Sequence, residues 1–324
     1  MTPAAAIPVF LASVALMLGA AAVFADRLDH MGMRLGLPET LLGLLTALAA
    51  DAPELTSAVT ALVEKRHAEA VGVVIGASAF NLAAMLGLSA IVASRVRARH
   101  EALEVEAFVG LWIVAVVLAV TAGGISATPG IGLVAFIAVP YLVLLAVGPG
   151  RLPSRFLERS FGEHHRRERT IDSRREVLSL VAVLLVALCV IVAGGIGAVR
   201  SVNDLADAWS VPQALVGVLI LAPLSALPNA WTGVRFGLKK RGSALMSETL
   251  NSNSINLVAG IALPATLGII GTFSGLNIFG LAWLLGMTAV AVVLFGRHGG
   301  GGRVAGSFLI ALYVVFVAVQ LAIS

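Results

Sequence analysis

Two carboxylates lie within an apolar stretch that runs from Leu41 to Val63. Asp51 and Glu54 are three residues apart, so on a helix they share a face, and Pro53 between them removes a backbone donor. A charge at the centre of a bilayer costs about 2.5–3.5 kcal/mol, and such residues line cavities or lie inside protein. The pattern predicts a cation site in a broken membrane helix. The competing interpretation, a soluble helix that begins with a proline and acidic residues, is disfavoured by the apolar surroundings.

The segment 37–88 recurs later in the chain as the segment 211–263. Leu37-Pro38 matches Val211-Pro212, Pro53-Glu54 matches Pro228-Asn229 at an offset of 175, and the segments that end at Asn81 and Asn256 match at the same offset. The matching positions include the proline and the polar residues, which chance similarity between apolar helices does not favour. We expect a first half at 1–149, a basic connection at 150–176 and a second half at 177–324.

The candidate cation ligands are the polar residues at and after the two proline breaks. Glu248, Ser252 and Asn256 are four apart and form one stripe on a helix. Hydrogen bonding between helices is the alternative role. For Asn81 and Asn256 a role in the cation site is favoured over hydrogen bonding between helices, because the two residues occupy equivalent positions in the repeats. For Glu248 the two roles are equally favoured. The full predicted set is Asp51, Glu54, Ser78, Asn81, Ser225, Asn229, Glu248, Ser252 and Asn256.

Oxygen ligands suit hard cations such as Na⁺, Ca²⁺ and Mg²⁺, or a proton carried by a carboxylate. The predicted spans contain no His at their centres and a single Cys, Cys189, which cannot form a ligand set alone, and this disfavours soft transition metals. They also contain no Ser/His/Asp set, metal motif or phosphate-binding loop. We therefore expect no catalytic residues and no cofactor, only transported cations.

The composition predicts a membrane protein that crosses the bilayer several times. Of the 324 residues 59% are hydrophobic and only 12% are charged, against about 25% charged in soluble domains. Apolar segments of bilayer length predict an all-α protein with ten transmembrane helices. Five spans in each half require the halves to insert with opposite orientations, as two inverted repeats with broken helices at the membrane midplane. The predicted spans are 5–25, 37–63, 70–93, 105–122, 129–148, 177–199, 211–236, 245–270, 276–296 and 304–323.

The basic residues predict the orientation of these spans. Nineteen of the 22 Lys and Arg residues lie in alternate connections, which the positive-inside rule assigns to the cytoplasm. Both termini are then extracytoplasmic, and the connection 150–176 is cytoplasmic. The net charge of +4 does not indicate nucleic-acid binding, because the basic residues fall in short connections between spans. The expected partners are inorganic cations and the lipid bilayer, in a cell-membrane protein that is a monomer or a weak homo-oligomer.

The two repeated motifs resemble those of the cation/calcium exchanger superfamily, of the sodium/calcium antiporter type. The first reads Ala-Ala-Asp-Ala-Pro-Glu (49–54) and Gly-Ala-Ser-Ala-Phe-Asn (76–81), and the second Leu-Ser-Ala-Leu-Pro-Asn (224–229) and Asn-Ser-Asn-Ser-Ile-Asn (251–256). The resemblance implies ten helices, alternating access and cation ligands from both repeats. The predicted topology resembles that of the family over the whole chain, whereas the matching motifs cover about 100 residues.

The motifs also depart from the family pattern. Ala50-Asp51 replaces a Thr-Ser pair, and Asn229 stands where the second repeat has a Glu. The expected site is therefore asymmetric, with both carboxylates in the first repeat. The resemblance implies an antiporter that exchanges a hard cation, with Ca²⁺ as the expected substrate, for Na⁺ or H⁺. The alternative is a membrane scaffold or sensor that kept the fold and lost transport.

Overall fold

The structure is a computed structural model that describes residues 3–35, 39–98, 100–147, 174–209, 216–296 and 300–323. Nearly all of the described chain is helical. The first half contains α1 (Pro3–Leu35), α2 (Glu39–Ala50), α3 (Ala52–Val63), α4 (His67–Asn81), the π-helix η1 (Leu82–Leu88), α5 (Ser89–Val92), α6 (His100–Thr121) and α7 (Ala127–Val147). The second half contains α9 (Arg174–Ala208), the π-helix η3 (Val216–Leu221), α11 (Ala222–Ser225), α12 (Leu227–Leu238), α13 (Gly242–Leu257), the π-helix η4 (Val258–Ala262), α14 (Leu263–Thr266), α15 (Gly275–Phe295) and α16 (Arg303–Ile323).

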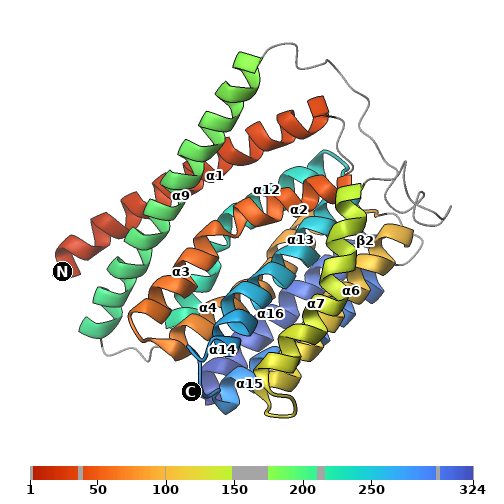
Figure 1. The fold of residues 1–324 in the computed structure, drawn as a ribbon. Coiled ribbons are helices and arrows are strands. Elements are labelled where there is room, and N and C mark those ends of the chain that lie inside the picture. The colour runs from red at the N-terminus through yellow and green to blue at the C-terminus, as the bar shows by residue number, and fades with distance from the viewer. Residues whose placement is uncertain are drawn as a thin grey trace.

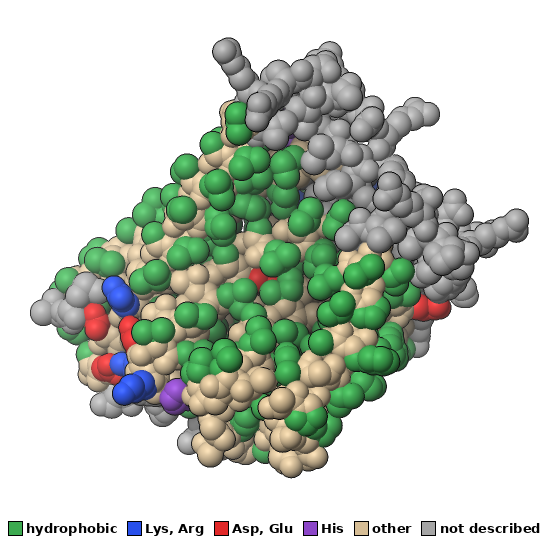
Figure 2. All heavy atoms as spheres, viewed as in Figure 1, with side chains coloured by type: hydrophobic (Ala, Val, Ile, Leu, Met, Phe, Trp, Pro, Cys, Tyr) green, Lys and Arg blue, Asp and Glu red, His purple; other side chains and the backbone are tan. Residues whose placement is uncertain are grey.

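The helices form a bundle with one pair set along its side. Figure 1 shows α1 and α9 lying together beside the remaining helices, and these two helices pack extensively against each other. Both are longer than the spans predicted at 5–25 and 177–199, because the helix continues past the apolar sequence into Asp26 and Asp207. The surface in Figure 2 is dominated by hydrophobic side chains, with a small acidic area near the centre of the visible face. Such a surface is suited to contact with lipid.

Seven helices of the described chain are long and apolar enough to cross a membrane. The bent pair Val216–Ser225 and Leu227–Leu238, with an angle of 45° between its parts, adds an eighth. The chain is therefore a multi-pass membrane protein. The predicted spans 37–63 and 245–270 are not among these eight, since α2 and α3 are separate helices and α13 carries a row of polar residues. The count of ten stays a prediction.

The two repeats predicted from the sequence are visible in the bounds of the elements. Helices α3 and α12 both have 12 residues and begin 175 positions apart, at 52 and 227. The same offset separates the starts of α4 and α13, at 67 and 242, and a π-helix follows each of them. The turns before α4 and α13 also match, because Lys65 and Lys240 both have a positive φ, of 61° and 58°.

Connections that the charge pattern assigns to the same side of the membrane contact one another. The strands β1 (Arg95–Val96) and β2 (Gly301–Gly302) pair antiparallel, and Arg303 donates to the Ile91 carbonyl and to the Ser94 hydroxyl. Arg235 forms an ion pair with Asp26. Among the connections assigned to the opposite side, Arg66 pairs with Asp207 at 2.7 Å. The alternation of the spans is consistent with all of these contacts.

The proline breaks take the same form in both repeats. Asp51 separates α2 from α3, and Ala226 separates α11 from α12, with Pro53 and Pro228 in the first turn of the following helix. Proline fits there because the first turn leaves its N–H groups without helical partners. The hydroxyl of Ser57 donates to the Pro53 carbonyl at 2.7 Å, and Thr232 donates to the Pro228 carbonyl at 2.9 Å. The sequence prediction of a break at Pro53 is thus confirmed.

Helix α4 is central and reaches the second repeat by a close approach at Gly76. A Cβ atom added to Gly76 would lie 2.7 Å from the Ala222 Cβ and 2.9 Å from the Val218 carbonyl oxygen. Only glycine lets α4 approach η3 and α11 this closely, as small residues do in other membrane bundles. Gly76 therefore has a packing role at the contact between the two repeats.

We predict that Gly76→Ala destabilises the folded protein, because the added methyl group displaces the backbone of the second repeat. The cost should be about 1–3 kcal/mol, as for other overpacked cores. The measurement is the thermal unfolding midpoint of the purified protein in detergent. Gly286→Ala on α15 is the matched control, since a Cβ there has no atom within 4 Å. Equal midpoints for the two variants would contradict the close approach.

Candidate cation site between the repeats

The carboxylates of α2–α3 meet the polar row of α13 in the interior of the bundle. Helix α13 packs against α2, α4 and α12, so residues of both repeats converge there. Asp51 and Glu54 have no exposed surface, although they carry the most strongly hydrated groups in the region. The break between α2 and α3 orients both side chains towards the second repeat. Both predicted carboxylates therefore lie where residues of the two repeats converge.

Asn229 joins the two carboxylates. Its side-chain nitrogen Nδ2 donates to Asp51 Oδ1 at 2.8 Å and to Glu54 Oε1 at 2.7 Å. Because both acceptors face one nitrogen, the two carboxylates lie close together, and Asn229 holds them from the opposite repeat. Asn229 is the repeat equivalent of Glu54. A carboxylate at this position would have no proton to donate and would repel both partners.

Ser252 on α13 is the second point of convergence. Its hydroxyl donates to Asp51 Oδ1 at 2.5 Å and accepts from Asn81 Nδ2 at 2.9 Å. Asn229 Nδ2 also lies 3.4 Å from this hydroxyl oxygen. Five of the predicted residues therefore form one hydrogen-bonded network that crosses between the repeats.

The network leaves several buried oxygen atoms without a hydrogen-bond donor among the described residues. Buried acceptors in proteins are normally satisfied, and each exception calls for an explanation such as a bound ion or water. A cation interacts with oxygen atoms of this kind, whereas further donors would be needed for a purely structural network. Among the predicted site residues the unsatisfied oxygens are Asp51 Oδ2, Glu54 Oε2, Ser78 Oγ, Asn81 Oδ1, Asn229 Oδ1, Asn256 Oδ1 and both carboxylate oxygens of Glu248, and one donor, Asn256 Nδ2, is unsatisfied as well.

No cation in the described part of the chain forms an ion pair with either of the two carboxylates, Asp51 and Glu54. As a general scale, two unit charges about 4 Å apart repel by roughly 4 kcal/mol at an effective dielectric constant of about 20. Glu248 on α13 is also fully buried and interacts electrostatically with both Asp51 and Arg241. The arrangement attracts a cation or a proton.

The predicted residues differ in how closely they join the site. Asp51, Glu54, Asn81, Asn229 and Ser252 are joined directly by hydrogen bonds. Ser78, Glu248 and Asn256 are fully buried with unsatisfied oxygens. Ser225 is different, because its hydroxyl donates to the Ala222 carbonyl of its own helix at 3.2 Å. Among the described residues no group of three or more His, Cys, Asp or Glu side chains is placed to hold a metal ion, so neutral oxygens would have to contribute.

A second buried polar cluster was not predicted. Glu106 on α6 accepts from the Tyr141 hydroxyl of α7 at 3.4 Å, and Tyr141 in turn contacts Asn251 of α13 at 3.1–3.2 Å. Asn251 also donates to the Ser247 carbonyl at 2.8 Å. Glu106 is the second residue of the predicted span 105–122 and was not among the predicted site residues. The available signal was the pair Ser247 and Asn251, which lie four apart on a second face of α13.

Comparison with known proteins places the chain in a family. The family described as sodium/calcium exchanger protein matches residues 5–147 and 179–322, one segment for each half of the chain. The chain belongs to the sodium/calcium exchanger family. Comparison with curated proteins found no match.

Solved structures of a sodium-calcium exchanger, NCX_Mj, share the fold of this family member. One was soaked with 100 mM Na⁺ and 10 mM Sr²⁺; it has a TM-score of 0.70 and 19% sequence identity, and the match covers 98% of this chain and 99% of that chain. Another was soaked with 10 mM Na⁺ and zero Ca²⁺, with a TM-score of 0.69, 18% identity and the same coverage. At this identity the likeness establishes the fold with its two repeats.

We predict that Ser252→Ala destabilises the protein and that Ser225→Ala does not. Removing the Ser252 hydroxyl takes a donor from Asp51 and an acceptor from Asn81, and unsatisfied buried groups cost about 1–3 kcal/mol. The Ser225 hydroxyl bonds only to its own helix, so its loss should change stability by less than about 0.5 kcal/mol. Thermal unfolding in detergent without divalent cations compares the two variants. A larger loss for Ser225→Ala would show that the network around Ser252 is assigned wrongly.

Proposed function

We propose that the protein is a secondary antiporter that exchanges a hard cation, with Ca²⁺ as the expected substrate, for Na⁺ or H⁺. Membership of the exchanger family supports this function. The observation that carries it is the set of buried oxygens without donors around two carboxylates that no Lys or Arg of the described chain neutralises. Hard cations prefer oxygen ligands of this kind.

In this proposal the two carboxylates supply the charge and the neutral groups complete the coordination. Asp51 and Glu54 together balance one divalent cation, or two monovalent cations or protons. The remaining predicted ligands are Ser78, Asn81, Ser225, Asn229, Glu248, Ser252 and Asn256. Asn229 has two roles: its Nδ2 donates to both carboxylates in the present arrangement, and rotation of its amide would turn the unsatisfied Oδ1 towards a bound cation.

Transport would proceed by alternating access between the two repeats. We propose ten spans, with α2–α3 and α13–η4–α14 added to the eight found by length and composition, and an inverted relation between the halves. The matched bounds of α3 and α12, and of α4 and α13, support this arrangement. Broken helices at corresponding positions are typical of transporters whose site lies at the midplane. The charge pattern supports extracytoplasmic termini and a cytoplasmic connection 150–176.

The proposal predicts gradient-driven Ca²⁺ flux in proteoliposomes that depends on both carboxylates. Glu54→Gln and Asp51→Asn should each reduce the flux by about tenfold or more, because each removes one of the two charges on which cation affinity depends. The flux should be measured with an inward or outward Na⁺ gradient and, separately, with a pH gradient. The gradient that drives Ca²⁺ uptake identifies the coupling ion.

Glu64→Gln is the matched control for these variants. Glu64 is an exposed carboxylate just beyond α3 and contacts Arg66 at 3.8 Å, away from the site. It should retain the parent flux. Unchanged flux in both Glu54→Gln and Asp51→Asn would refute the assigned site. A well-folded protein without flux of any cation would instead favour the inactive scaffold or sensor.

The role of Asn229 leads to a separate prediction. Asn229→Asp removes the shared donor and adds a third carboxylate, so the unfolding free energy without divalent cation should fall by about 3 kcal/mol or more. Added Ca²⁺ should raise the unfolding midpoint of the variant more than that of the parent, because it neutralises the extra charge. A smaller Ca²⁺ effect in the variant would show that Asn229 does not adjoin the cation.

A further inference from the structure

An apolar hollow of about 580 Å³ lies between α1, the η1–α5 segment and α12. Its walls include Leu18 of α1, Val92 of α5, and Trp231 and Val234 of α12, and all ten of its lining residues are apolar. Pro228, in the first turn after the break in the second repeat, also lines it. The hollow therefore lies directly behind Asn229 of the candidate cation site.

A second hollow, of about 380 Å³, is lined by basic residues. Arg95 and Arg97 follow α5, Lys240 follows α12, and Gly237 and Gly242 contribute buried backbone. The three basic side chains are exposed, and within the described residues none of them has an ion-pair partner. Three cations around one hollow repel each other unless an anion lies between them.

The two hollows are consecutive along the same two elements. On one wall the chain passes from Val92 in the apolar hollow to Ala93 and Arg95 in the basic hollow. On the other wall it passes from Val234 to Gly237, which is less than one turn of helix, about 5 Å. The two hollows therefore adjoin along both walls, and we refer to them together as the groove, with an apolar part and a basic end at the side of the membrane that the charge pattern assigns to the cytoplasm.

Contacts between the connections of the two repeats fix the position of the basic end of the groove. Pairing of β1 with β2 fixes the turn that carries Arg95, and Arg303 holds the end of α5 through the Ile91 carbonyl and Ser94. Gly242 lies against the backbone of Arg97, so the connections of the two repeats are in direct contact. These contacts place the cations from both repeats around one point.

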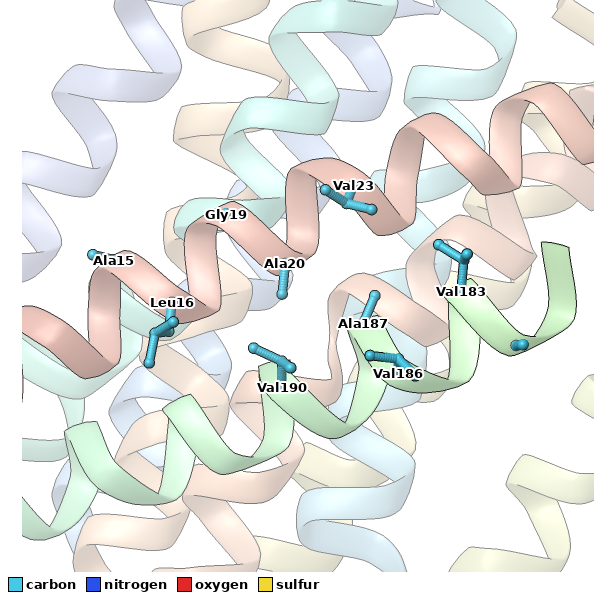
Figure 3. A pocket seen from close by; sticks show the side chains of 10 residues that line it. Ala15, Leu16, Gly19, Ala20, Val23, Val183, Val186, Ala187 and Val190 are labelled. Carbon is cyan, nitrogen blue, oxygen red and sulfur yellow. The ribbon is translucent and has the colours of Figure 1, made fainter. Parts of the chain in front are cut away.

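We propose that this groove binds an anionic phospholipid, with the phosphate among Arg95, Arg97 and Lys240 and an acyl chain between α1 and α12. Basic pockets at the cytoplasmic ends of membrane helices bind anionic headgroups. The groove differs in this respect from the hollow of about 510 Å³ between α1 and α9, whose lining shown in Figure 3 is entirely apolar and has no charged end. The bound lipid would connect α1 to the break before Asn229.

The test measures binding and does not depend on transport. The delipidated full-length protein in detergent is titrated with phosphatidylglycerol, phosphatidylcholine or inorganic phosphate, with native mass spectrometry and the thermal unfolding midpoint as readouts. We expect phosphatidylglycerol to be retained and to raise the midpoint, and the other two to have little effect. Equal effects of phosphatidylcholine, or an equal effect of inorganic phosphate alone, would overturn the assignment of an anionic lipid.

Two variants locate the lipid in the groove. Arg97→Gln combined with Lys240→Gln should weaken phosphatidylglycerol binding by about thirtyfold, from the contribution of two interfacial cations. Ala22→Leu should narrow the apolar part and also weaken binding, because Ala22 lines this hollow and not the hollow between α1 and α9. Arg200→Gln, which removes an exposed cation from α9 instead, should bind as the parent does. Parent-like binding in both groove variants would refute the proposal.

Discussion

The structure depends on how two like charges are kept in an apolar interior. Asp51 and Glu54 are fully buried, and no described cation pairs with them. The protein offsets their charge only with polar donors, chiefly the amide of Asn229 and the hydroxyl of Ser252. Both donors come from the second repeat, so the two halves are held together by the groups that face the negative charge. A cation would compete with these donors for the same oxygens.

The negative charge can be offset in this way because the two repeats carry different residues at equivalent positions. Where the first repeat has Glu54, the second has Asn229, which supplies two N–H groups in place of a charge. The matching prolines nevertheless keep both positions in the first turn of a helix after a break. The two repeats therefore share their backbone structure but differ in their side chains. The first repeat supplies the carboxylates, and the second supplies the amide and hydroxyl groups that donate to them.

The sequence predicted the parts of the site that local rules control. Proline at a break, acids in an apolar span and the offset of 175 led to Asp51, Glu54 and Asn229 as candidates, and hydrogen bonds join these three residues in the structure. It did not separate Ser252 from Ser225, because which hydroxyl meets a carboxylate depends on how helices rotate when they pack. Glu106 was missed for a related reason: its partners Tyr141 and Asn251 lie on other helices, and only tertiary packing brings them together.

The π-helical turns have a consequence for chain length. η1 and η4 each follow a polar row directly, and a π-turn accommodates one residue more than an α-turn. Deleting a single residue from Leu82–Leu88 would therefore be absorbed by conversion of the π-turn to α-helix, with the two flanking segments left in register. Deleting a residue from α4 would instead rotate Asn81 by about 100° relative to the start of its helix. Relatives that keep the site should therefore keep the lengths of α4 and α13 and tolerate a one-residue difference in the π-helices that follow them.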